Sequence, residues 1–179
     1  MRRREGVAAL LASAALLAAS LAHAFELPDG RVTPGAVGSV DGAPPPSTSQ
    51  VCVRGYARSV RHPYDSDWRR YRTAIFREYG IAHAEWSQFT IDHLVPLELG
   101  GRPFGIVGGA WDLRNVWPEP KAEAEQKDAV ENAVHEAVCY RSGFRGLHLS
   151  LSDAQRAMER DWTHTPVGLP PVRQEILER

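Results

Sequence analysis

Cysteine is scarce in this sequence, and hydrophobic residues form only one long run, at the N-terminus. The two cysteines do not form a C-x-x-C pattern, which argues against a thiolate metal site. The formal net charge is −1, so total charge does not mark a nucleic-acid binder. No later segment is apolar enough to cross a bilayer. The composition of the full sequence, 43% hydrophobic and 24% charged residues, is typical of a single globular domain.

The N-terminal run has the pattern of an export signal. Arg2-Arg3-Arg4 precedes an apolar stretch from Val7 to Leu21, and Ala22-His23-Ala24 ends it. A basic start, an apolar centre and an Ala-x-Ala finish predict a signal peptide over residues 1–24. We expect the protein in a bacterial periplasm or in the medium, without stable membrane insertion. An uncleaved membrane anchor is the alternative.

Export would place the two cysteines in an oxidising compartment. Cys52 and Cys139 stand near opposite ends of the expected domain. A disulfide between them would close a long loop and stabilise the fold by about 2–4 kcal/mol. We therefore expect a structural bridge between these cysteines and no catalytic role for either.

Positive charge is concentrated in one stretch, although removing residues 1–24 leaves a net charge of −3. Seven arginines lie between Arg54 and Arg77, interleaved with aromatic residues. Such a stretch can neutralise phosphates and offer rings to bases, and the candidates for nucleic-acid binding are Arg69, Arg70 and Arg72. The alternative is a solvated helix face whose aromatic residues point into the core.

The chain divides into a leader, one domain and a tail. Residues 25–50 are rich in proline, glycine and serine, which predicts a flexible leader. The domain is expected over residues 51–163, and the tail, residues 164–179, is expected to be an irregular strap with a short terminal helix. No internal repeat is visible.

Periodicity predicts the elements of the domain. Apolar residues recur at helical spacing over residues 67–79 and 121–140, and Ser152-x-x-Gln155 is a capping-box pattern that starts another helix. Alternation over residues 51–58 predicts an extended segment. Residues 89–91 predict a strand that ends at Asp92 and His93, with a return strand over residues 105–111 and a rigid extended stop at residues 117–120. These elements indicate a small α+β fold.

Two motifs carry the chemistry. The first reads Asp92-His93-Leu94-Val95-Pro96-Leu97-Glu98-Leu99-Gly100-Gly101, and the second reads Asn115-Val116-Trp117-Pro118-Glu119-Pro120. A carboxylate can hold a hard cation through oxygen, and the adjacent imidazole can accept a proton from water near neutral pH. An acid, an imidazole and a downstream amide suit the hydrolysis of a metal-bound phosphate.

These motifs resemble the HNH endonuclease family, in particular a bacterial exported branch with D-H-L-x-P-L-E-L-G-G and N-x-W-P-E-P motifs. The likeness covers roughly residues 50–162. It implies a ββα-metal unit, here wrapped by additional helices. It also implies that Asp92 binds one divalent cation, that His93 activates the attacking water and that Asn115 holds the loop that orients His93.

The third position departs from the family pattern. Where many members place His or Asn on the helix, this chain has Glu123-Ala124-Glu125. Glu123 is the better candidate for a second metal ligand and Glu125 the next; the alternative is that both are exposed acids at a helix start. Mg²⁺ or Mn²⁺ is the expected ion, and Zn²⁺ or Ni²⁺ is also compatible with such a site.

The resemblance implies a metal-dependent nuclease with low sequence selectivity that acts on DNA, with RNA as the alternative substrate. We expect a monomer. One rival is a catalytically silent scaffold that binds nucleic acid or an envelope partner. Another is a hydrolase of a different phosphoester. The missing third His or Asn favours the silent scaffold.

Overall fold

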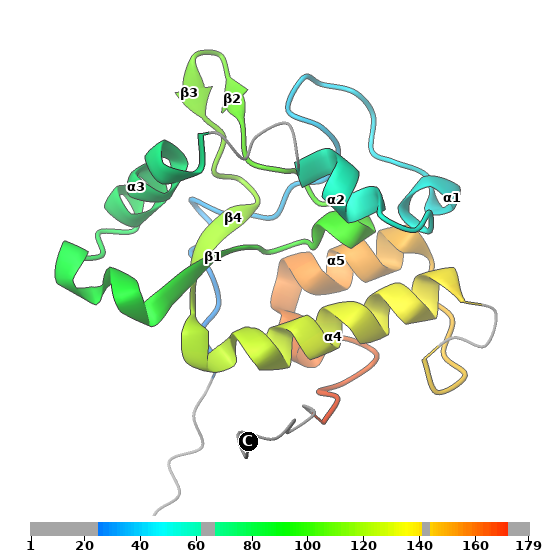
Figure 1. Ribbon diagram of the computed structural model, residues 1–179. Coiled ribbons are helices and arrows are strands. Elements are labelled where there is room, and N and C mark those ends of the chain that lie inside the picture. The colour runs from blue at the N-terminus through cyan, green and yellow to red at the C-terminus, as the bar shows by residue number, and fades with distance from the viewer. Residues whose placement is uncertain (1–24, 62–66, 141–143, 172–179) are drawn as a thin grey trace, which may run out of the picture.

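The computed structural model describes residues 25–61, 67–140 and 144–171, so the expected signal peptide lies outside the described residues. It confirms a small mixed α+β fold (Figure 1). The helices are α1 (Thr48–Val51), α2 (Tyr56–Arg61), α3 (Trp68–Glu78), α4 (Lys121–Cys139) and α5 (Leu151–Asp161). The strands are β1 (Phe89–His93), β2 (Ile106–Val107), β3 (Ala110–Trp111) and β4 (Val116–Pro120), and short 3-10 helices cover His83–Gln88, Leu97–Leu99 and Trp162–His164.

A hairpin of β1 and β4 forms the centre of the molecule. The strands are antiparallel, with Asp92 opposite Trp117 and His93 opposite Val116. The expected return strand at residues 105–111 is wrong, because β2 and β3 pair only with each other. The true partner is the proline-containing stretch expected to be a stop. Each strand of a two-stranded sheet has an open edge, where a proline without an N–H is tolerated.

Helices cover both faces of this hairpin. On one face, Tyr71 and Ile75 of α3 pack with Val116. On the other face, Trp117 packs with Val130 and Val134 of α4, and α5 lies alongside α4 (Figure 1). The helices expected over 67–79 and 121–140 are confirmed to within two residues at each end. The hairpin is therefore held between two apolar clusters.

Two local predictions need correction. Residues 51–58 are not extended, because α1 ends at Val51 and α2 begins at Tyr56. The N–H of Ser47 donates to Gln50 Oε1 at 2.8 Å, which favours a helical turn there over the alternation of Val51 and Val53. The N-cap of α5 is Ser150, two residues before the expected one, and its hydroxyl accepts from the N–H of Asp153.

The disulfide between Cys52 and Cys139 is confirmed. It joins the residue after α1 to the last residue of α4, with a Cα–Cα distance of 5.3 Å. Such a bridge is typical of proteins in oxidising compartments. No helix within the described part of the chain is both long and apolar enough to cross a membrane.

Residues 25–50 lie against the domain and differ in this respect from the expected flexible leader. The ring of Phe25 packs edge-on against Trp162, with centroids 4.9 Å apart. The hydroxyl of Thr33 donates to the carbonyl of Val116 at 2.9 Å. Gly35 has a positive φ of 86°, and a Cβ there would lie 2.6 Å from Glu159 Cγ. Its glycines and prolines therefore shape a fixed path.

The expected strap is present as far as the structure describes it. Residues 165–171 follow the last 3-10 helix without regular structure, and Gln126 of α4 donates to the carbonyl of Pro170 at 2.8 Å. The expected terminal helix lies outside the described residues.

Candidate active site

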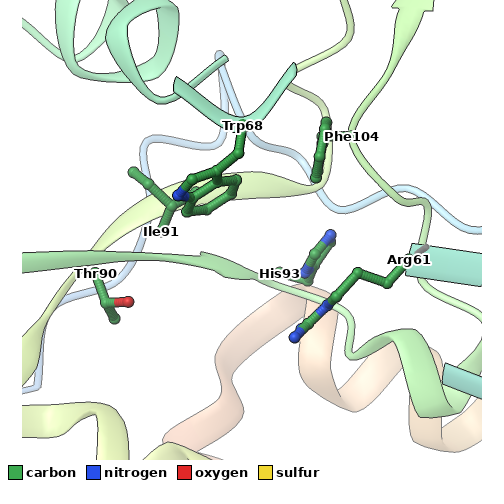
Figure 2. Close-up of a pocket in the computed structure, with 6 residues that line it drawn as sticks. All are labelled: Arg61, Trp68, Thr90, Ile91, His93 and Phe104. Carbon is green, nitrogen blue, oxygen red and sulfur yellow. The ribbon is translucent and has the colours of Figure 1, made fainter. Parts of the chain in front are cut away.

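The end of β1 presents Asp92 and His93 to opposite faces of the hairpin, because side chains alternate along a strand. Asp92 faces α4, whereas His93 lies on the face covered by α3. In Figure 2 the imidazole of His93 lies between the ring of Phe104 and the guanidinium of Arg61. The sequence pattern that predicted β1 therefore also fixes where the two adjacent side chains point.

Asn115 fastens the loop that follows β1. Its Oδ1 accepts from the N–H of Val95 at 2.9 Å, and its Nδ2 donates to the carbonyls of Val95 at 2.9 Å and Arg102 at 3.0 Å. The N–H of Leu94 donates to the backbone carbonyl of Asn115. A Cβ at Gly101 would lie 1.8 Å from the carbonyl oxygen of Val95, so only glycine fits there. The expected loop-holding role of Asn115 agrees with this geometry.

The carboxylate of Asp92 is paired with Lys127 of α4. The ammonium of Lys127 donates to Asp92 Oδ2 at 2.5 Å and to the carbonyl of His93 at 2.9 Å, and it also pairs with Glu131. The Lys127 side chain is fully buried. Burial alone would lower its pKa, but the charges of Asp92 and Glu131 raise the pKa above the ordinary value. A buried ammonium thus joins the end of β1 to α4.

Lys127 also acts on the ionisation of Asp92. Burial would raise the pKa of the Asp92 carboxyl, but the charge of Lys127, then that of His93, lowers it below the ordinary value overall. The Asp92 side chain is 22% exposed in spite of its pairing. Asp92 is therefore an ionised carboxylate that solvent can reach.

More carboxyl groups surround the ammonium than its single charge can balance. Burial, followed by the negative charge of Asp92, raises the pKa of Glu119 to about 8. Burial also raises the pKa of Glu131 well above its ordinary value and raises that of Glu98. Oε1 of Glu119 and Oε1 of Glu98 have no hydrogen-bond partner among the described residues. This acidic cluster, Glu98, Glu119 and Glu131, lies around the Asp92–Lys127 pair.

His93 is buried and neutral. It is 7% exposed, and its Nε2 has no hydrogen-bond partner among the described residues. Burial lowers the pKa of His93 to about 4; the charge of Asp92 opposes this shift, and those of Arg61 and Lys127 add to it. The imidazole is therefore unprotonated near pH 7 and can accept a proton from a water molecule.

A cavity of about 430 Å³ lies beside His93. Its lining combines aromatic, aliphatic and polar side chains: Arg61, Trp68, Thr90, Ile91, His93 and Phe104 (Figure 2). Its volume lies within the range of about 300–1,000 Å³ that is common for ligand sites. The imidazole thus lies at the wall of a space that a ligand could enter.

The expected second metal ligands do not join Asp92. Glu123 is buried in the first turn of α4, where its Oε2 accepts from the backbone N–H of Glu26 at 2.9 Å. Glu125 is exposed. Lys127, one turn after Glu123, is the α4 residue that reaches Asp92. Among residues 25–61, 67–140 and 144–171, no three or more His, Cys, Asp or Glu side chains are arranged to hold a metal ion.

The arginines expected to bind nucleic acid separate into two kinds. Arg69 and Arg70 are exposed on α3. Arg72 instead donates to the carbonyl of Trp86 at 3.1 Å and lies over the ring of Phe76, 4.9 Å from its centroid, so its guanidinium has a structural contact. Among the aromatic residues of this stretch, Tyr71 is buried in the core, as the alternative reading expects.

Sequence reasoning gave no role to Lys127 and left Glu119 out of the site. A signal for Lys127 was present, because Glu123, Lys127 and Glu131 are spaced four apart and share one helix face with the buried Val130 and Val134. A lysine is almost never fully buried unless an acidic group pairs with it, so a lysine on a buried face indicates a nearby carboxylate. The electrostatic interaction of Glu119 with Asp92 and Lys127 depends on β4, which the sequence did not predict as a strand.

Comparison with protein-family models, with curated proteins and with solved structures found no match to this chain.

Proposed function

We propose that this protein is an exported nuclease that hydrolyses phosphodiester bonds with the help of a divalent metal ion. The observation that carries the proposal is the environment of His93. A neutral, buried imidazole with an unpartnered Nε2 lines a cavity at the end of β1, and the preceding residue, the ionised Asp92, lies at the same strand end on the side of α4. These are the groups that phosphodiester hydrolysis needs: a base for water and a carboxylate for a cation.

In the proposed reaction, His93 accepts a proton from a water molecule. The water oxygen forms a bond to phosphorus, the ester P–O bond breaks with its electron pair on the leaving oxygen, and that oxygen takes up a proton from solvent while His93 returns its own proton to water. The role of Asn115 is positional, because its side chain fixes the backbone of Val95, two residues after His93. The lowered pKa of His93 keeps the base unprotonated well below pH 7.

Asp92 is the residue that would hold the metal ion. Its side chain is 22% exposed, so it can be reached from solvent while Oδ2 stays paired with Lys127. Mg²⁺ often binds through one or two carboxylates, with water and substrate phosphate as its other ligands, so a single protein ligand fits this ion better than Zn²⁺. A bound divalent ion would polarise the phosphate and stabilise the leaving oxygen.

The rival function is a silent scaffold that binds nucleic acid without cleaving it. The specific observation that favours it is the Asp92–Lys127 ion pair, because an ammonium already neutralises the carboxylate that a metal would need. Isothermal titration of the wild-type protein and of Asp92→Asn with Mg²⁺ and Mn²⁺ separates the two functions. The nuclease requires binding that Asp92→Asn weakens, whereas the scaffold predicts no binding to either protein.

The test of the nuclease is the nicking of supercoiled plasmid in the presence of Mg²⁺, Mn²⁺, Ni²⁺ or Zn²⁺. His93→Ala should reduce the rate by about 10²–10⁴-fold, because it removes the base. It should leave metal affinity and circular dichroism unchanged. His148→Ala, which removes an exposed histidine that does not line the cavity, is the matched control and should keep the wild-type rate.

Two results would overturn the proposal. One is that the wild-type protein neither nicks plasmid nor cleaves single-stranded nucleic acid in the presence of any of the four metals. The other is His93→Ala protein that cleaves at the wild-type rate, which would attribute the activity to another site or to a contaminant.

A further inference from the structure

The cavity beside His93 has an aromatic wall whose outermost ring is accessible. Trp68, the first residue of α3, is 38% exposed, and its ring centroid lies 5.7 Å from that of Phe104. In Figure 2 the two rings lie on one side of His93, and the side chain of Arg61 lies on the other. The cavity therefore offers an aromatic surface on one side of His93 and a cation on the other.

Buried neighbours fix this wall in place. Phe104 is only 3% exposed and stacks on Tyr71, with centroids 4.5 Å apart and an angle of 28° between the rings. The hydroxyl of Tyr71 donates to the carbonyl of Asp112 at 2.8 Å. Trp68 is thus the exposed end of an aromatic row that is anchored in the core. A ring held in this way can stack a planar ligand with little loss of conformational freedom.

We propose that this cavity binds an unpaired nucleobase next to the phosphate cleaved at His93, with Trp68 stacking on the base and Arg61 contacting the backbone. The substrate class is single-stranded nucleic acid. The inference rests on the proposed nuclease function and adds a base site to it. Rings and a cation in one groove are the combination with which proteins bind single strands.

The shape of the site explains why the base must be unpaired. In a duplex, both faces of each base are covered by neighbouring bases, so a base reaches an aromatic side chain in a cavity only after it leaves the stack. The described lining holds few polar groups that could read the edge of a base: Thr90, His93 and Arg61. Stacking tolerates every base, so such a site selects single strands without selecting sequence.

The experiment measures binding without cleavage. Fluorescence anisotropy in EDTA measures the affinity of the protein for three strands of about twelve nucleotides: oligothymidylate, oligouridylate and an abasic strand of equal charge. Wild-type protein should bind at least one of the two base-carrying strands about tenfold more tightly than the abasic strand. The two strands distinguish DNA from RNA as the source of the base.

Variants test whether the preference for strands that carry bases depends on the aromatic wall of the cavity. Trp68→Leu should remove it, and Trp68→Phe should retain most of it. Tyr140→Leu is the matched control, since Tyr140 is an exposed aromatic residue outside the cavity, and it should keep the full preference. Arg61→Gln should weaken binding to all three strands equally, because a phosphate contact does not depend on the base.

The inference is overturned if wild-type protein binds the abasic strand as tightly as both other strands. Binding of a duplex of equal length more tightly than either single strand would also overturn it, as would an equal loss in Trp68→Leu and Tyr140→Leu. Because EDTA removes the metal, these results do not depend on catalysis. If the protein cleaves but shows no preference for strands that carry bases, the nuclease proposal stands and the nucleobase site is wrong. If it shows this preference but does not cleave, the nucleobase site stands and the nuclease proposal is wrong.

Discussion

Lys127 is the residue on which the electrostatics of the site depend. Its ammonium is fully buried and contacts Asp92, Glu131 and the carbonyl of His93. Removing one partner of a buried ion pair leaves the opposite charge uncompensated, which commonly costs about 3–5 kcal/mol. We expect Lys127→Met to lower the free energy of unfolding by roughly that amount, measured by equilibrium urea denaturation.

The control for this variant is Lys121→Met, at an exposed position at the start of α4. It should change the free energy of unfolding by about 0.5 kcal/mol or less. If Lys127→Met unfolds at the same urea concentration as the wild-type protein, the buried pair does not stabilise the fold.

Glu119 makes stability depend on pH. Its pKa is about 8 in the folded protein, against an ordinary value of 4.5, so the folded state keeps a proton that the unfolded chain releases. Its contribution to stability is therefore complete below about pH 4.5, decreases as the pH rises, and is lost above about pH 8. Glu119→Gln cannot ionise and lacks this contribution.

The expected outcome is a changing difference between two unfolding curves. From about pH 5 to about pH 8, the free energy of unfolding of the wild-type protein should decrease relative to that of Glu119→Gln, and the difference should level off at higher pH. Urea denaturation of both proteins at several pH values measures it. Parallel pH dependences would show that Glu119 ionises alike in the folded and unfolded states.

At the scale of elements, the loop after β1 depends on Asn115. This side chain makes four hydrogen bonds to the backbone, with the N–H of Ala36, both groups of Val95 and the carbonyl of Arg102, and is 1% exposed. Asn115→Ala would leave buried N–H and C=O groups of Val95 unpaired, at a cost of about 1–3 kcal/mol for each group. We expect the free energy of unfolding to decrease by about 2–4 kcal/mol and the amide of Val95 to exchange hydrogen faster.

Asn132→Ala provides the comparison for this variant. Asn132 is an exposed asparagine whose Nδ2 donates within α4 to the carbonyl of Asp128 at 2.7 Å. The two measurements are urea denaturation and amide exchange followed by NMR. Equal losses in the two variants would mean that Asn115 has no special role in holding the loop.

The sequence predicted the elements whose side chains follow a clear period. The apolar stripe of α4 and the β-branched residues of β1 identified both elements and placed Asp92 and His93 at a strand end. β4 was missed because Pro118 and Pro120 disfavour a strand in general, and they are tolerated here because each strand of a two-stranded sheet is an edge strand. Asp92 and His93 could be recognised as site residues because they are neighbours in the sequence. The contact of Lys127 with Asp92 could not, because it depends on how α4 packs on the hairpin.

At the scale of the whole molecule, composition misled about residues 25–50. Proline and glycine disfavour helices and strands, and from sequence alone this effect is the same in a flexible chain and in an irregular chain with a fixed path. The hydrogen bonds that fix this segment join it to residues much further along the chain. Local sequence patterns contain no information about such contacts, so this part of the fold could not be predicted.

These contacts bear on the order in which the molecule can assemble. The segment meets the loops around Asn115 through pairs such as Thr33 with Val116 and Ala36 with Asn115, which are 83 and 79 positions apart. Contacts between such distant residues form slowly, because a long loop must close before they contribute stability. During refolding, α4 and α5 can therefore form well before the surroundings of His93 are complete. Recovery of helical structure would precede recovery of the native surroundings of His93.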